Sequence, residues 1–147
     1  MTACIFCQIA DGIEPASVVY EDAEFIAFMD AYPLTKGHCL VLPKKHVVRL
    51  HELTAKERSR LFSIGHKLIE AQKKAGWGIN GTNLLLNDGQ DANQTVPHLH
   101  LHLIPRSSGD WFRALPKLAL HVSGIFGLKA SRKTLDAQAA EILAKIP

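Results

Sequence analysis

Three histidines alternate with three leucines between residues 98 and 104. This two-residue period predicts a half-buried strand that carries His98, His100 and His102 on one face and the leucines on the other. Neighbouring imidazoles on that face would stand about 6–7 Å apart, twice the rise per residue of a strand. Such a row suits a metal site, because neutral imidazole is a common ligand, or catalysis at phosphorus with imidazole as the nucleophile. A strand with merely exposed histidines is the third interpretation.

A second set of reactive side chains lies near the start of the chain, where Cys4 and Cys7 are three residues apart. Two cysteines at this spacing can face one ion from a tight turn and form half of a tetrahedral zinc site. The same pair is also compatible with two small buried side chains or with a redox pair. A redox pair usually opens a helix after a strand, and no strand is expected before Cys4.

The bulk composition narrows the class of protein. The chain has 147 residues, the length of one domain, and 47% of them are hydrophobic. The net charge of +3 favours anionic ligands but is far below that of a dedicated nucleic-acid binder. We expect no membrane span and no signal peptide. Three cysteines without secretory context predict a reducing, cytoplasmic location without disulfides.

The elements that must position these residues follow from periodicity and turn signals. Strands are expected at residues 18–20, 25–29, 38–42, 83–87 and 98–104. A capping box, Thr54 with Glu57, opens a long helix that ends at Gly76. Thr134 is expected to cap a C-terminal helix, while residues 118–129 have no clean period. We therefore predict an α+β fold, a five-stranded antiparallel sheet with one long helix and a C-terminal helix.

The stretch 98–104 resembles the signature of the histidine triad (HIT) superfamily of nucleotidyl hydrolases and transferases. Asp30, after an apolar strand, resembles the ribose-binding aspartate of that family. Residues 37–46 (GHCLVLPKKH) resemble its G-H-x-L-V-[IL]-P-K-x-H segment, and residues 87–96 resemble its N-x-G…G-Q-[ST]-V phosphate loop. The order of the motifs is similar to the Hint-like branch, including bacterial members with an N-terminal C-x-x-C.

The resemblance spans residues 4 to about 106. It implies a single HIT domain over residues 1–147, with its core at about 4–106 and a C-terminal extension at about 107–147. Two positions depart from the family pattern. Asn93 stands where the family usually has glycine, and asparagine is the residue that best tolerates the positive φ of such a position. Pro97 precedes the triad and removes one backbone N–H there.

The resemblance also implies roles. His100, the central imidazole, would be the nucleophile that forms a nucleotidyl-histidine, held by a hydrogen bond from its other nitrogen to a backbone carbonyl. His102 would contact the phosphate and the leaving group, with His98 beside the nucleophile. The nucleotide would be a purine nucleotide, bound at Ile5, Phe6, Phe28, Asp30, Asn87, Asn93, Gln94 and Thr95. Plain core packing is the alternative for the apolar members of this set.

In zinc-containing relatives, a C-x-x-C, a distant histidine and the first triad histidine close one tetrahedral site. The corresponding residues here are Cys4, Cys7, His46 and His98, so the resemblance implies a structural Zn²⁺. Packed cysteines with a His46–His98 hydrogen bond are the alternative. The resembled branch also implies a homodimer.

Other functions stay open at this point. Within the same superfamily, a dinucleoside polyphosphate hydrolase would use the same residues. A zinc-dependent hydrolase with two triad histidines as ligands would need a nearby carboxylate, and no acidic residue flanks the triad in sequence. A nucleotide-binding regulator with weak activity is a further possibility, whereas the chain shows no basic stripe with interleaved aromatic residues for nucleic acid.

Overall fold

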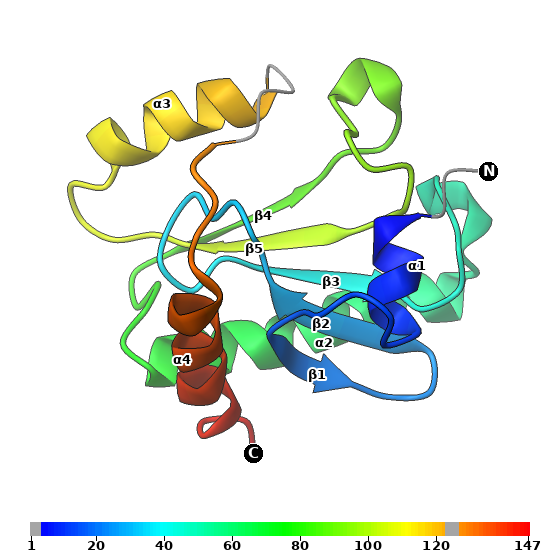
Figure 1. Cartoon of the computed structure of the whole chain (residues 1–147), viewed down its shortest axis with the longest axis horizontal. Helices are drawn as coiled ribbons and strands as arrows, with labels where there is room; N and C mark the ends of the chain where they lie inside the picture. Colours follow the sequence, from blue (N-terminus) through cyan, green and yellow to red (C-terminus); the bar gives the residue numbers. More distant parts are fainter. Residues whose placement is uncertain (1–3, 123–126) are drawn as a thin grey trace.

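The computed structural model describes residues 4–122 and 127–147, and one antiparallel sheet lies at its centre (Figure 1). The strands are β1 (Val18–Glu21), β2 (Phe25–Met29), β3 (Cys39–Pro43), β4 (Thr82–Leu86) and β5 (Leu101–Pro105). They pair in the order β1-β2-β3-β5-β4. The predicted α+β fold with a five-stranded antiparallel sheet is therefore confirmed. Expectations that concern residues 1–3 and 123–126 lie outside the described residues.

Helix α2 (Ala55–Lys74) begins at the capping box that the sequence indicates. The Glu57 N–H donates to Thr54 Oγ1 over 3.2 Å, and the Thr54 N–H donates to Glu57 Oε2 over 2.7 Å. These two bonds satisfy backbone donors that the first turn of a helix leaves open. Gly76, just beyond the helix, has a φ of 88°, a value that glycine adopts without strain.

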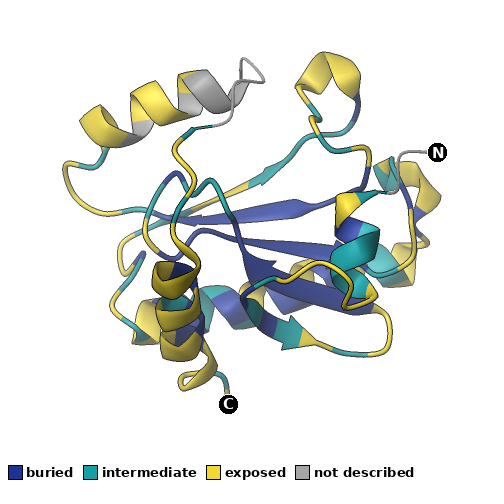
Figure 2. Cartoon of the chain, in the orientation of Figure 1, coloured by how far each residue is buried: buried dark blue, intermediate teal, exposed yellow. Residues whose placement is uncertain are grey.

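The central strands β2, β3 and β5 are buried on both faces, and a different helix set covers each face (Figures 1 and 2). The apolar sides of α2 and α4 (Arg132–Leu143) pack on one face, where Leu99, Leu101 and Leu103 are buried. Burying each such leucine contributes about 2 kcal/mol. The short helix α1 (Ile5–Ala10) covers the opposite face around Phe28 and Leu40. Because side chains alternate along a strand, the triad imidazoles point toward the α1 side.

Register ties the triad strand to its neighbours. In the β3–β5 ladder, Leu40 pairs with His102 and Cys39 pairs with Leu103. On the other side of β5, Leu85 of β4 also pairs with His102. The centre of the triad segment is thus held between two strands, while β4 forms one edge of the sheet. Cys39 is fully buried, as expected for a residue inside the strand predicted at 38–42.

Helices α1 and α3 (Trp111–Val122) are elements that the sequence analysis did not predict. Cys4 is the N-cap of α1 and Cys7 lies within it, so the cysteine pair is presented by a helix rather than by a tight turn. Helix α3 starts at Trp111, within the C-terminal extension. The unassigned segment 118–129 contains the end of that helix.

The start of α4 also differs from the expectation. Ser131, not Thr134, is the N-cap, and the Thr134 N–H donates to Ser131 Oγ over 3.2 Å. Thr134 thus sits at the third helical position, and its N–H is a donor that the Ser131 cap satisfies. Among the described residues, no helix has the length and apolar character needed to cross a bilayer.

Candidate active site

The three triad histidines lie side by side beneath α1. Regular β-structure begins at Leu101, so only His102 is inside β5, while His98 and His100 occupy the extended stretch before it. Their relative exposures are 0%, 4% and 2% for His98, His100 and His102. The Phe6 ring meets the His100 ring edge-on, with centroids 5.1 Å apart. This burial removes the interpretation in which the histidines are simply exposed on a strand.

The two nitrogens of His100 have different roles. Nδ1 lies 2.7 Å from the backbone carbonyl oxygen of His98, which can only accept a hydrogen bond. Nδ1 therefore carries the ring proton and donates it. In the neutral ring, Nε2 then carries the lone pair, and His100 is among the residues that line the adjacent cavity. The geometry is the one that the sequence analysis expected for this residue.

A second set of contacts fixes the tautomer of His102. The Leu34 N–H donates to His38 Nδ1 over 3.0 Å, which places the proton of a neutral His38 on Nε2. That atom lies 2.9 Å from His102 Nδ1 and 3.4 Å from Asp30 Oδ2. His102 Nδ1 accordingly accepts a hydrogen bond, and its own ring proton lies on Nε2. The chain Leu34, His38, His102 thus orients an imidazole N–H.

Sequence reasoning did not assign His38 to the site, although the residue lies within the G-H-x-L-V motif. It is fully buried, 64 residues before His102 in the chain. A histidine next to an apolar strand gives no signal of its own for such a contact. The pairing of β3 with β5 is what brings the two rings together.

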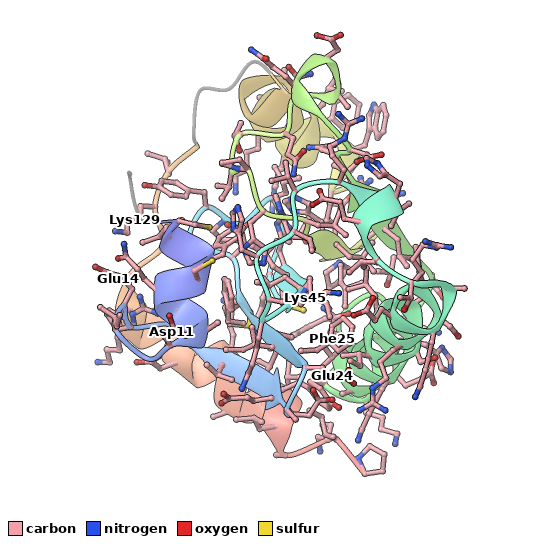
Figure 3. All side chains as sticks on the ribbon, turned by 90° about the vertical axis from the view of Figure 1, so that its right-hand side faces the viewer. Asp11, Glu14, Glu24, Phe25, Lys45 and Lys129 are labelled. Atoms are coloured by element: carbon pink, nitrogen blue, oxygen red, sulfur yellow. The ribbon has the colours of Figure 1, made fainter. Side chains whose placement is uncertain are left out.

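A cavity of about 250 Å³ opens between α1, the connection to β1 and the loop before the triad. Figure 3 looks onto α1, with Asp11 at its C-terminal end and Glu14 in the connection to β1. Most of the predicted nucleotide-binding and catalytic residues line this cavity: Ile5, Phe6, Phe28, Asp30, Asn87, Thr95, His100 and His102. Its wall also includes residues that the sequence analysis did not single out: Ile9, Pro15, Ala16, Met29, Ala31, Tyr32, Leu40, Val96 and Arg132.

The cavity has an apolar part and a polar part. Ile5, Ile9, Pro15 and Ala16 contribute apolar wall from α1 and the segment that follows it. Imidazole, hydroxyl and amide groups come from the triad strand and the loop before it. Asp30, 6% exposed, accepts a hydrogen bond from the Tyr32 N–H over 2.8 Å and keeps its other oxygen near His38.

The loop over residues 87–97 shows one agreement and one difference. Asn93 has φ 59° and ψ 37°, the left-handed conformation expected for an asparagine in a glycine position. The Gln94 side chain, however, bonds to backbone on both sides: its Oε1 accepts from the Gly89 N–H of the same loop over 2.9 Å, and its Nε2 donates to Val48 O, outside the loop, over 2.8 Å. Gln94 and Asn93 are not among the cavity-lining residues, and the Gln94 amide is hydrogen-bonded to protein backbone at both of its polar atoms.

A cluster of metal-type ligands adjoins the triad. Cys4 Sγ lies 3.4 Å from His98 Nδ1, and Cys7 Sγ lies 3.6 Å from the same atom and 3.3 Å from His46 Nδ1. All four ligand atoms lie within 4.8 Å of one another. His98 Nε2 is 2.8 Å from Pro43 O, so this nitrogen donates and Nδ1 is left facing the cysteines. Burial lowers the pKa of His98 to about 4, which keeps the ring neutral near pH 7.

Comparison with known proteins identifies the family. The family model described as HIT domain matches residues 12–109. The chain belongs to the HIT domain family. It is 46% identical, over 107 residues, to an uncharacterised HIT-like protein of Methanocaldococcus jannaschii, covering 73% of this chain and 81% of that protein. It is 36% identical, over 109 residues, to a Schizosaccharomyces pombe protein named adenosine 5′-monophosphoramidase, covering 74% of this chain and 78% of that one.

Among solved structures, the HIT chain resembles a Zn-bound histidine triad family protein from Mycobacterium smegmatis. The TM-score is 0.77 with 30% sequence identity, and the match covers 98% of this chain and 93% of that one. The likeness therefore includes the region beyond residue 109, where α3 and α4 lie. The presence of Cys4 and Cys7 near the N-terminus agrees with the branch that the sequence analysis named.

The donor set of this HIT protein fits zinc. Zn–S and Zn–N bonds of about 2.3 and 2.0 Å place the ligand atoms of a tetrahedral site roughly 3.5 Å apart, close to the distances between the cysteine sulfurs and the two imidazole nitrogens. The bond from His98 to Pro43 O is the kind of second contact that orients a ligating histidine. Burial and the neighbouring Cys4 raise the pKa of the Cys7 thiol to about 11. A bound cation would favour the thiolate instead.

A second group, Asp30, His38 and His102, also brings ligand-type atoms within 4.8 Å. This is the nearby carboxylate that a zinc-dependent hydrolase would need, and sequence proximity did not reveal it. The 2.9 Å separation of His38 Nε2 and His102 Nδ1, with the tautomer set by Leu34, is that of a hydrogen bond. The hydrogen bond that His38 donates to His102 thus explains the close approach of the two rings.

Proposed function

We propose that this HIT protein is a nucleotide hydrolase or nucleotidyl transferase that acts at the α-phosphate of purine nucleoside phosphoramidates or related nucleotides. The observation that carries the proposal is the hydrogen bond from His100 Nδ1 to His98 O, which leaves Nε2 as the basic nitrogen of a residue that lines the cavity. The relative from Schizosaccharomyces pombe named adenosine 5′-monophosphoramidase supports this substrate class.

The first step is an attack by the His100 Nε2 lone pair on the α-phosphorus. A nitrogen–phosphorus bond forms, and the bond from phosphorus to the leaving amine or phosphate breaks. His102 Nε2–H, which His38 and Leu34 orient, donates a hydrogen bond to the leaving group, and the proton that completes the leaving amine comes from solvent. The product of this step is a nucleotidyl-histidine, and the difficult displacement is divided into two easier ones.

In the second step, water attacks the same phosphorus and releases a proton to solvent, while His102 Nε2–H donates a hydrogen bond to a phosphoryl oxygen. The nitrogen–phosphorus bond breaks, and a nucleoside monophosphate leaves together with restored His100. Thr95 and Asn87 line the cavity where hydrogen bonds to the phosphoryl oxygens would lower the barrier. We assign the purine base to the apolar wall of Ile5, Phe6 and Phe28, and the ribose hydroxyls to Asp30.

Turnover of adenosine 5′-phosphoramidate beside a diadenosine polyphosphate tests the proposal. We expect faster hydrolysis of the phosphoramidate and an acid-sensitive nucleotidyl-protein adduct in single-turnover samples quenched in base. Preferred cleavage of the dinucleotide would favour the dinucleoside polyphosphate hydrolase. Nucleotide binding without turnover of either substrate would instead support a regulatory role and overturn the enzymatic assignment.

We also propose a structural Zn²⁺ held by Cys4, Cys7, His46 and His98. Four protein ligands leave no open coordination position, so the ion would fix α1 and His98 without taking part in chemistry. Cys4, Cys7 and Cys39 form no disulfide in the described part of the chain, which is consistent with the reducing, cytoplasmic location that we propose for the protein.

A homodimer is the proposed assembly. The β4 edge presents Leu84, 46% exposed, and the nearby α3 presents Trp111 and Phe112, 56% and 84% exposed. A second copy would cover both the strand edge and these apolar side chains, which is the usual reason for a two-fold contact.

A further inference from the structure

One wall of the cavity comes from beyond the matched family domain. Arg132, the first residue of α4, lines the same cavity as His100 and Asp30, although the family model ends at residue 109. Just before it, the Ala130 N–H donates to Ala31 O over 2.9 Å. This bond fixes the entrance of α4 against the residue that follows Asp30, so Arg132 is placed at the cavity by backbone as well as by side-chain contacts.

The Arg132 guanidinium is held by a small network. Nη1 donates to Ser17 Oγ and Nη2 donates to Pro15 O, each over 3.0 Å. Ser17 is 4% exposed and in turn donates to Asp136 Oδ1 over 2.5 Å. Asp136 lies one helical turn after Arg132 in α4. Two of the five N–H groups of the guanidinium thus orient it. An arginine oriented in this way loses less entropy when it binds a ligand.

The position of Arg132 decides which part of a nucleotide it meets. Its partner Pro15, with Ala16, belongs to the apolar part of the cavity, the part assigned to the base. Among the described residues that line the cavity, Arg132 is the one with a fixed positive charge. A phosphate on the ribose would have to lie beside the Asp30 carboxylate, which repels it. The base edge is therefore the better partner.

We propose that Arg132 is a specificity-determining residue that favours 6-oxopurine nucleotides, those of guanine and hypoxanthine, over adenine nucleotides. The inference rests on the proposed function for the placement of the base. A guanidinium only donates hydrogen bonds. Guanine presents the acceptors O6 and N7 side by side, whereas adenine carries an amino donor in place of O6. Arg132 thus gains a bond with the first base and meets a competing donor with the second.

The test is equilibrium binding of GMP, IMP and AMP to the full-length protein and to variants at this position. IMP isolates the contribution of O6, because it carries that oxygen without the 2-amino group of guanine. In the wild type, we expect GMP and IMP to bind roughly tenfold more tightly than AMP. In Arg132→Ala, this advantage should disappear through weaker binding of GMP and IMP, with AMP affinity changed less than about twofold.

Two further variants complete the experiment. Arg132→Lys keeps the charge but not the planar donor pair, so it should retain only part of the preference. Lys133→Ala, at an exposed neighbouring position outside the cavity, should keep all of it. Thermal melting of each variant checks that α4 remains docked.

The outcomes separate this inference from the proposed function. An equal loss of affinity for all three nucleotides in Arg132→Ala would show a merely structural residue and overturn the inference. A wild type without a 6-oxopurine preference, or a preference that survives in Arg132→Ala, would overturn it as well. If the protein bound none of the nucleotides, the nucleotide-based function would fall with it. Binding that depends on Arg132, without any turnover, would keep the specificity role and remove only the enzymatic step.

Discussion

The triad histidines differ in which ring nitrogen the protein has already engaged. His100 uses Nδ1 as a donor to His98 O, His102 uses Nδ1 as an acceptor from His38, and His98 uses Nε2 as a donor to Pro43 O. Three residues of one type, spaced by two, therefore present a basic nitrogen, an N–H and a metal-type nitrogen. Backbone carbonyls and a buried partner make this distinction, because the side chains themselves are identical.

We predict that His100→Ala lowers kcat for a nucleoside phosphoramidate by at least about a hundredfold, because no other group on the strand offers the same nitrogen to phosphorus. Binding of AMP should change only a few-fold. Steady-state hydrolysis beside a binding titration measures both quantities. His66→Ala, an exposed histidine on α2, is the control and should behave like the wild type. A His100→Ala enzyme that kept more than about a tenth of the wild-type kcat, only ~1.4 kcal/mol of barrier, would contradict the nucleophile assignment.

For single residues, the sequence predicted which side chains lie near the triad, but not all of their hydrogen-bond partners. Alternation placed the three imidazoles on one face, and the apolar cavity residues followed from the family resemblance. The link from His38 to His102 spans 64 residues and depends on the β3–β5 register. The inward turn of Gln94 depends on Gly89 and Val48, contacts that local pattern does not encode.

Among the elements, the β1–β2 hairpin shows how a polar turn is fixed to α2. Asp22 accepts hydrogen bonds from Tyr20 and Arg60 side chains, each over 2.6 Å, and from the Glu24 and Phe25 N–H groups. Burial by itself would raise the pKa of Asp22, but these hydrogen bonds outweigh it and hold the pKa well below 3.8. The ionised carboxylate is therefore the form that stabilises the folded hairpin.

We predict that Asp22→Asn lowers the free energy of unfolding by about 1–2 kcal/mol at pH 7. Because the folded-state pKa is depressed, the stabilisation is present above the ordinary value and is lost as pH falls through the folded value. The stability gap between wild type and variant should then shrink as pH is lowered below about 4. Denaturant unfolding at a series of pH values measures it, with the exposed Glu24→Gln as the control. A gap that stayed constant with pH would refute the charge-based explanation.

Helix α1 is the element that zinc would secure. It has six residues, no side-chain hydrogen bond at its N-cap and no acidic residue in its first turn. Isolated helices of this length are unstable in water. The helix therefore depends on contacts with the rest of the protein. Phe6 packs against the sheet, and Cys4 and Cys7 are the proposed metal ligands.

We predict that the purified wild type contains zinc and that Cys4→Ser loses it. Structural zinc contributes on the order of 10 kcal/mol of apparent binding free energy in small peptides, so chelator should clearly lower the wild-type melting temperature. The melting temperature of Cys4→Ser should already be low and should not respond to chelator. Cys39→Ala removes a thiol outside the cluster and should keep its metal. A metal-free wild type that melts together with Cys4→Ser would show that the cysteines only pack.

The elements that escaped sequence-based prediction share a physical feature. The α1 segment is too short to show a helical period, and α3 contains Pro116, a residue that usually argues against a helix interior. For α4, Ser131 and Thr134 are both competent N-caps. Ser131 is the one used, next to Ala130, whose N–H is bonded to Ala31 O. By contrast, α2 carries a complete capping box and a long apolar stripe, so its limits were predictable.

For the whole molecule, the proposed homodimer gives a direct prediction. Light scattering at micromolar concentration should show a species of twice the chain mass of 16.2 kDa. Leu84→Lys places a charge on the exposed β4 edge and should shift the population toward monomer, whereas Lys133→Ala on α4 should not. A wild type that remains monomeric at micromolar concentrations would contradict the proposed assembly.

The cavity wall joins the two ends of the chain, with Ile5 and Phe6 from the first helix and Arg132 from the last. Such a site has high contact order, because its formation requires closure of a loop that spans most of the chain. During synthesis, α4 would have to be completed before the chain could bind a nucleotide. Once formed, the complex would couple the docking of α1 to that of α4, since a ligand that binds only the closed cavity stabilises both. Nucleotide would then slow hydrogen exchange at both termini together, far beyond the residues that it touches.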